Sequence, residues 1–187
     1  MKVKEILKMT AEMAGESQLR AYYEQNAVDD VANCEENATL LLRCYNMIIE
    51  ELALEYLPLM FKEELQSDNQ KIYFSAFTHK PLRILAVYAE NGKKVPYRFV
   101  NDYLEVENGK LSIEYYYRPN RADEEDEVVY NDTLIGFYTI AYGMLSQYLL
   151  ERGRVSESNI YQEKYLNAVR ARIAQRNNLK LPGRRWI

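Results

Sequence analysis

The side chains that most often perform catalysis are few and isolated in this sequence. His79 is the only histidine, and it lies beside Lys80-Pro81 in a segment that we expect to be a loop. A general base or a metal ligand usually works with partner side chains at characteristic spacings, and no Ser-His, Cys-His or His-x-x-x-His pattern occurs here. The chain has only seven glycines, and none forms a Gly-rich phosphate loop. We therefore expect no catalytic centre and no bound cofactor.

Carboxylates are the other candidates for chemistry. The run Asp123–Glu127 superficially resembles the oxygen-rich shell of a divalent cation, but it lacks the ligand spacing and the glycine of a calcium loop. We interpret it as a solvated acidic loop, with cation binding as the alternative. Glu50-Glu51 and Glu63-Glu64 are adjacent pairs whose side chains diverge, so neither pair predicts an acid/base couple. The sequence indicates a protein that is not an enzyme.

The composition places the chain among soluble globular proteins. It is 48% hydrophobic and 28% charged, and no apolar run approaches the roughly 20 residues that span a bilayer. Cys34 and Cys44 are the only cysteines. They fall in one expected helix, where ten residues separate them by about 15 Å, too far for a disulfide. We expect a soluble, intracellular protein with free thiols and no membrane contact.

Helical periodicity dominates both ends of the chain. Apolar side chains recur at steps of three and four, and Gly15, Pro58 and Gly153 stand where helices would end. The pattern predicts helices over residues 3–15, from Ser17 to Tyr23, over 34–57, over 134–152, and from Ser156 onward.

The segment between Pro81 and Pro119 has the period of a β-strand instead. Leu111, Ile113 and Tyr115 alternate with more polar residues, so they would share one face of a sheet. Asn91-Gly92 and Asn108-Gly109 stand where hairpin turns need a positive φ. A further hairpin is expected from two segments upstream, Phe61–Leu65 and Ile72–Phe74.

Together these elements predict an α+β fold: a helical bundle with an inserted small antiparallel β module of about five to six strands, and an extended C-terminal tail. The expected parts are a discontinuous bundle over 1–60 and 130–176, the β module over 61–119, an acidic loop over 120–129 and a docking tail over 177–187.

Charge is unevenly distributed along the chain. Residues 151–187 include nine Lys or Arg and three acids, whereas the other 150 residues carry fifteen basic and twenty-five acidic groups. Such polarity suits nucleic acid, or a contact between the basic arm of one subunit and the acidic face of the next. The subunit-interface candidates on this basis are Arg170, Arg172, Arg176, Asp123, Glu124 and Glu125.

Aromatic residues favour packing and protein contacts. Tyrosine occurs seventeen times, with three in a row at 115–117. Alternating tyrosines can stack bases, but glutamates accompany the arginines here, so core packing or protein interfaces are the preferred interpretation. Trp186, the only tryptophan, lies beyond Pro182-Gly183, which ends any helix. It must dock either on the body of its own chain or on a partner.

These segments resemble the head-to-tail adaptor, or connector, proteins of tailed bacteriophages and prophages. The likeness lies in Ile84–Gly92, Asn108–Pro119, Ala141–Arg154 and the closing Leu181-Pro-Gly-Arg-Arg-Trp186. The order of elements is similar over nearly the whole chain.

The resemblance implies a structural virion protein at the head-tail junction, made in the host cytoplasm. It would form a ring, commonly a dodecamer, around the DNA exit channel, through which DNA passes without specific recognition. The implied partners are copies of itself, the portal protein, and a neck, stopper or tail protein. The resemblance also implies that the tail contacts the portal or a neighbour through Leu181, Pro182, Arg184, Arg185, Trp186 and Ile187.

The alternative function is a nucleic-acid-binding module. It would use the arginines of the last helix and of the tail to contact phosphates, and its affinity would fall steeply with salt. The residues concerned are Arg170, Arg172, Arg176, Arg184 and Arg185.

Overall fold

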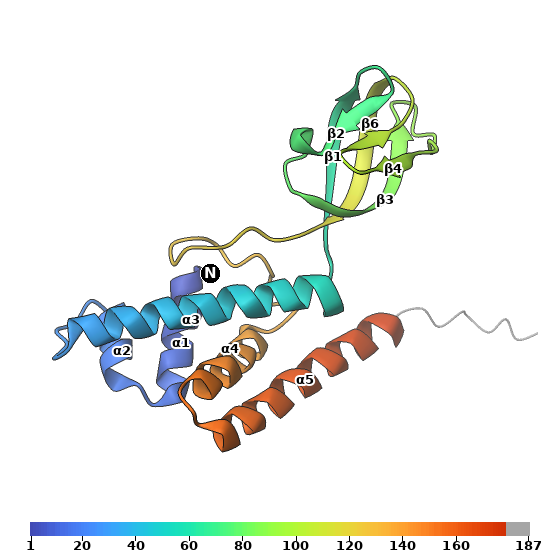
Figure 1. The fold of residues 1–187 in the computed structure, drawn as a ribbon. Coiled ribbons are helices and arrows are strands. Elements are labelled where there is room, and N and C mark those ends of the chain that lie inside the picture. Colours follow the sequence, from blue (N-terminus) through green and yellow to red (C-terminus); the bar gives the residue numbers. More distant parts are fainter. Residues whose placement is uncertain (179–187) are drawn as a thin grey trace, which may run out of the picture. The chain divides into compact units, whose positions relative to one another are not determined.

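The computed structural model describes residues 1–178, with side chains up to Gln175. The described residues form five α-helices and six strands in two antiparallel sheets, which confirms the predicted α+β class. The chain divides into two compact units (Figure 1). The helical unit comprises Met1–Glu51 and the chain from Arg121 onward, and the β unit comprises Leu52–Asn120. None of the helices in residues 1–178 combines the length and the apolar character that crossing a membrane requires.

The helical unit is built around α4, which lies between α3 and α5 (Figure 1). The backbone of Gly143 on α4 faces both Ile48 of α3 and Tyr165 of α5. The first helix packs on the second and on α4. The helices are α1 (Val3–Ala14), α2 (Ser17–Tyr23), α3 (Val31–Glu51), α4 (Phe137–Glu151) and α5 (Val155–Asn178).

The expected glycine stops are confirmed. Gly15, directly after α1, and Gly153, two residues after the end of α4, adopt φ values of 76° and 72°, and their N–H groups donate to the carbonyls of Glu12 and Leu150 respectively. A left-handed residue of this kind satisfies the last carbonyls of a helix at no steric cost when it is glycine. Cys34 and Cys44 are buried on α3 and free, as predicted.

The long helix ends differently from the prediction. The α-helical part stops at Glu51, and Leu52–Tyr56 form a π-helical turn. Leu57 donates its N–H to the carbonyl of Leu52, five residues earlier. Pro58 has no N–H and disfavours helix in the residue before it, so the regular ladder cannot continue. The single helix expected over 34–57 is thus an α-helix followed by a wider turn.

The β unit contains two three-stranded sheets, in the orders β1-β6-β3 and β2-β5-β4. The inward-facing side chains of both sheets form one apolar core, in which Leu111, Ile113 and Tyr115 alternate along β6 as predicted. The strands are β1 (Leu59–Ser67), β2 (Lys71–Tyr73), β3 (Pro81–Ala89), β4 (Arg98–Val100), β5 (Tyr103–Glu105) and β6 (Gly109–Tyr117).

The predicted pairing of the first two strands is wrong. β1 pairs along its whole length with β6, from Leu59↔Tyr117 to Ser67↔Gly109. The expected partner β2 pairs with β5 in the other sheet, and only the bridge Asp68↔Lys71 closes the turn between β1 and β2. Nine paired residues on β6 bury far more apolar surface than a three-residue hairpin could, so the long-range pairing is favoured.

One of the two predicted Asn-Gly turns is confirmed and the other is wrong. Gly92 has φ 77° and lies in a tight turn that folds the chain back onto β3. Asn108-Gly109 connects β5 of one sheet with β6 of the other, so it makes no hairpin. The second hairpin turn is formed by residues 101–102, between Val100 and its partner Tyr103.

Candidate interaction surfaces

Of the basic interface candidates on α5, one is exposed and one is hydrogen-bonded within the chain. Arg170 is exposed on α5. Arg172 donates from Nε to the carbonyl of Leu134 at 2.6 Å and from Nη1 to Gln175 at 2.9 Å. The backbone of Arg176 belongs to α5, but its side chain lies outside the described part. The expected contact residues of the tail, which run from Leu181 to Ile187, lie outside the described residues altogether.

The acidic loop is docked on the start of α1 through its backbone, while four of its five acidic residues are exposed, as expected of a solvated loop. The carbonyls of Glu124 and Asp126 each accept a hydrogen bond of 2.9 Å from the first N–H groups of α1, those of Lys4 and Val3. These N–H groups have no partner inside a helix and carry its partial positive charge. The loop therefore caps α1 and brings its carboxylates to the favourable end of the helix dipole.

The side chains of the acidic loop have different environments. Glu125 is exposed and forms an ion pair with Lys2, so the pKa of Glu125 is lowered by its hydrogen bond to that ammonium group. Glu124 is half-buried, and burial raises the pKa of its carboxyl against the opposing attraction of Lys4. The amide of Asp123 donates to the carboxylate of Asp126 at 2.7 Å. Part of the negative charge predicted for this loop is thus already paired within the chain, and only the remainder can interact with another molecule.

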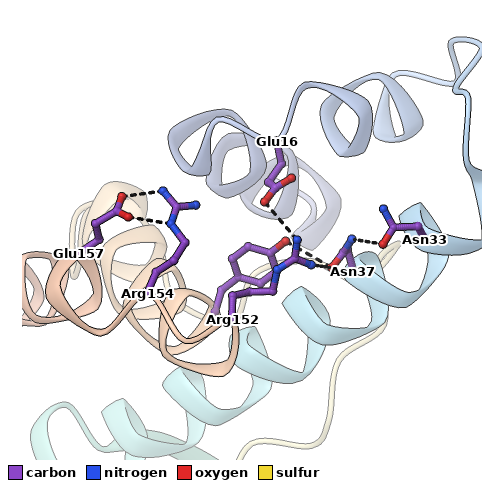
Figure 2. Close-up of polar contacts among 7 residues, drawn as sticks. Glu16, Asn33, Asn37, Arg152, Arg154 and Glu157 are labelled. Atoms are coloured by element: carbon purple, nitrogen blue, oxygen red, sulfur yellow. Dashed lines mark hydrogen bonds and ion pairs between the residues drawn. The ribbon is translucent and has the colours of Figure 1, made fainter.

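A polar cluster links the segments at one end of the helical unit (Figure 2). Arg152, directly after α4, donates to the side-chain oxygen of Asn37 on α3, and Asn37 in turn accepts from the buried hydroxyl of Tyr148. The guanidinium group also lies 3.7 Å from Glu16. Asn37 donates to Asn33 at 3.1 Å. Every side chain of the cluster has a hydrogen-bond or ion-pair partner. The cluster therefore joins the helices and does not look like a reactive site.

We expect Asn37→Ala to lower the free energy of unfolding by about 2 kcal/mol, because it removes the acceptor that Arg152 and Tyr148 share. Asn37 is only 5% exposed, so water cannot replace it easily. The matched control is Asn33→Ala, at the exposed end of the same chain of bonds, which should cost less than about 0.5 kcal/mol. Urea unfolding followed by circular dichroism measures both. Equal losses in the two variants would contradict a shared buried acceptor.

His79 lies in the loop before β3, as the sequence predicted, and it is half-buried there. Its ring stacks on Tyr117 with centroids 4.2 Å apart and meets Phe61 edge-on at 4.8 Å. Its Nδ1 is buried and has no hydrogen-bond partner among the described residues. Next to it, the carboxylate of Glu63 accepts from the hydroxyl of Tyr115 and from Thr78. These side chains converge because β1 pairs with β6, which the sequence did not reveal.

The smaller sheet of the β unit exposes aromatic surface. Tyr73 is 56% exposed on the outer face of this sheet, and Phe99, which pairs with Leu104 and so lies on the opposite face, is 49% exposed. Tyr73 packs beside Tyr103 across the sheet, with the Lys71 ammonium 4.8 Å from the Tyr103 ring centre. Exposed aromatic groups beside a cation are typical of protein contact surfaces. The predicted role of tyrosine in the core is also confirmed, since Tyr45, Tyr115, Tyr130, Tyr148 and Tyr165 are fully buried.

Within residues 1–178, no group of three or more His, Cys, Asp or Glu side chains is arranged to hold a metal ion. What the described geometry offers is a set of surfaces: an acidic region around α2 and the start of α3, a basic α5, and the aromatic face of the smaller sheet. In comparisons with known proteins, no model of a protein family matches the chain, and no curated protein matches it either.

Proposed function

We propose that the chain is a structural protein that assembles with copies of itself into a closed ring, and that this ring is a head-to-tail adaptor between a portal and a neck or tail protein. The observation that carries the proposal is the uneven charge of the helical unit: exposed carboxylates gather where α2 is followed by α3, and the sequence from Arg170 onward contains basic residues and no acid.

The acidic end lies where α2 is followed by α3. Four exposed carboxylates occupy the loop before α3 and the first turns of that helix. These four residues are Asp29, Asp30, Glu35 and Glu36. Among the described residues, the nearby cations Lys8 and Arg20 are already paired with Glu24 and Glu12. The carboxylates at this end are therefore available to a positively charged surface.

The described basic side chains of the segment from Arg170 onward, those of Arg170 and Arg172, lie on the second half of α5. α5 runs in the same direction as α3 (Figure 1): its start is next to Asn37, through Arg152, and its middle is next to Glu51, through the hydroxyl of Tyr165 at 3.3 Å. From Arg170 to Ile187 the sequence contains six basic residues and no acid. Arg170 and Arg172 thus lie far from the carboxylates at the start of α3.

Two unlike, complementary ends favour a heterologous contact, in which one surface of a subunit binds a different surface of the next. Such contacts generate rings when the rotation closes and filaments when it does not. A virion adaptor requires the closed form. The exposed aromatic face of the β unit supports a second kind of contact, to a protein above or below the ring.

Measuring the mass and the shape of the assembly tests the ring directly. We expect the full chain to associate at low salt, to dissociate as salt screens the opposite charges, and to give rings with a central hole in negative-stain images when mixed with a candidate portal protein. Truncation after Asn178 should abolish assembly. A truncated chain that assembles with portal as the full chain does, in analytical ultracentrifugation, would refute a role for the tail.

The same basic segment supports the second candidate, nucleic-acid binding, because Arg170 is exposed and no carboxylate follows it in the sequence. A gel-shift assay at low salt separates the two functions. The adaptor should bind DNA weakly and without sequence preference. Tight binding whose logarithm falls linearly with the logarithm of salt concentration would favour the nucleic-acid module instead.

A further inference from the structure

We propose that residues 179–187 of one copy bind in a groove between α2 and α3 of the next copy, with Trp186 as the anchor. This inference rests on the proposed ring, for which it identifies the two contacting surfaces. The groove is the receiving site, and the tail of a neighbouring subunit is its ligand.

The groove is a cavity of about 510 Å³ in the helical unit, within the size range of sites that hold a large side chain and its neighbours. Segments distant in sequence build it: the start of α1, the end of α2, the loop to α3, and the acidic loop. Its wall is apolar at Val28 and at Val31, which is 51% exposed. The main lining residues are Lys4, Tyr22, Tyr23, Val28, Val31 and Glu124.

Two residues that line the groove, Tyr23 and Glu124, carry polar groups that their surroundings do not fully stabilise. The hydroxyl of Tyr23, a residue only 4% exposed, is buried and has no hydrogen-bond partner among the described residues. Burial raises the pKa of the Glu124 carboxyl despite the nearby Lys4. Buried polar groups of this kind are stabilised when a ligand supplies a donor or a positive charge. The groove therefore suits a ligand with an apolar body, N–H donors and cationic groups.

The C-terminal segment has this chemistry. Leu179, Leu181 and Trp186 supply apolar surface, the indole of Trp186 supplies an N–H donor, and Arg184 and Arg185 supply positive charge. The segment contains no acidic residue, and it would face the exposed carboxylates around the start of α3. Trp and Arg are also the residues most often found to dominate binding energy at protein interfaces.

Chain length excludes binding of the segment to its own groove. The hydroxyl of Tyr165 contacts Glu51, the last residue of α3, and α5 continues 13 residues beyond Tyr165 to Asn178, or about 20 Å. The groove lies at the opposite end of α3, whose 21 residues span about 30 Å. The path is therefore roughly 50 Å, whereas nine fully extended residues reach about 32 Å at most. Only a second copy can accept the tail.

The experiment uses the full-length chain and the fluorescence of its single tryptophan. Wild type should show a blue-shifted Trp186 emission that appears with concentration as subunits associate. Val31→Arg, which places a cation at the mouth of the groove, should weaken association by at least about tenfold and leave the emission of an exposed indole. The matched control is Met47→Arg on the same helix, with a similar exposure of 48% and no part in the groove; it should behave as wild type.

Mixing two variants tests the head-to-tail direction. Val31→Arg retains a working tail and Trp186→Ala retains a working groove, so neither should associate alone, but an equimolar mixture should form one-to-one dimers in sedimentation velocity. Normal association of Val31→Arg, or equal losses in Met47→Arg, would overturn the groove assignment while the ring stands. A wild-type chain that stays monomeric with an exposed Trp186 at all concentrations would overturn both.

Discussion

Replacing Gly143 with valine is expected to lower the free energy of unfolding of the helical unit by about 3 kcal/mol or more. A Cβ atom at this position would lie 3.0 Å from Cδ1 of Ile48 and 3.0 Å from Cδ2 of Tyr165. Both neighbours are buried within the core, at 1% and 0% exposure, so neither can move away without displacing a helix. Valine adds a Cβ and two methyl groups at a place where the Cβ alone would already lie 3.0 Å from both side chains.

The size of the substituent should set the size of the effect. Gly143→Ala causes a smaller collision, and its gain of about 1 kcal/mol in helix propensity offsets part of that cost. Its free energy of unfolding should therefore lie between those of the wild type and the valine variant. Gly136→Val is the matched control, because the nearest atoms to a Cβ there, on Asp132 and Thr139, are both 3.9 Å away. Chemical unfolding followed by circular dichroism measures all three. A valine at 143 that costs no more than one at 136 would show that α3, α4 and α5 are not so closely packed.

High pH is expected to unfold the protein, because several groups that ionise at alkaline pH are buried in the helical unit. Burial raises the pKa of the Cys44 thiol to about 11 and that of the Tyr148 hydroxyl to about 12. It also raises the pKa of Tyr45 and of Tyr23. In the unfolded chain these groups return to their ordinary values of about 9 for the thiol and 10 for tyrosine.

A pKa that is higher in the folded state stabilises the fold at low pH, and this contribution disappears as the pH rises from the unfolded to the folded value. For Cys44 the loss runs from about pH 9 to 11 and for Tyr148 from about pH 10 to 12, at roughly 1.4 kcal/mol per unit each. The stability lost through Cys44 and Tyr148 together approaches the whole free energy of unfolding of a small domain. We therefore expect cooperative unfolding between about pH 10 and 12, below the folded-state pKa values of the tyrosines.

This expectation is tested by measuring two signals, tyrosinate absorbance and helical circular dichroism, in the same pH titration. Tyrosinate absorbance of the buried tyrosines should rise together with the loss of helical circular dichroism, since these hydroxyls ionise only as the unit opens. Cys44→Ala should remove the earliest part of the loss, near pH 9 to 10, and leave the later part. Complete tyrosine ionisation near pH 10 with an unchanged dichroism spectrum would show that the hydroxyls are accessible in the fold.

The helices could be predicted from the sequence because the information that defines them is local. The apolar stripes of α3, α4 and α5 and the stops at Gly15 and Gly153 depend on residues within a few turns. The end of α3 could not be predicted, since a π-helical turn before Pro58 leaves the same apolar pattern as a continued α-helix.

The strands could be found but their partners could not. Alternation on β6 identifies a strand and its buried face, and it does not identify which other strand lies alongside. The pairing of β1 with β6 spans about fifty residues of sequence, and it alone brings Phe61 and Tyr117 together around His79. An Asn-Gly pair predicts a change of direction, which at Asn108-Gly109 leads from one sheet to the other.

The candidate surfaces were predicted only in outline. The uneven charge identified α5 and the acidic loop, but the docking of that loop on α1 depends on backbone carbonyls, which have no signature in the sequence. The groove was missed for a related reason: Lys4, Tyr22, Val31 and Glu124 come from four separate segments. A half-buried carboxylate in an acidic run cannot be told from its exposed neighbours before the fold is known.

The pairing of Leu59 with Tyr117 also bears on how such a chain can change over time. These residues stand where the polypeptide leaves the helices and where it returns to them, and they face each other across adjacent antiparallel strands, about 5 Å apart. Everything between them could be lengthened, exchanged for a different domain or excised to a short turn, and the two ends to be rejoined would already be neighbours. Selection can therefore remodel this insertion to match new binding partners while the surrounding scaffold keeps its structure.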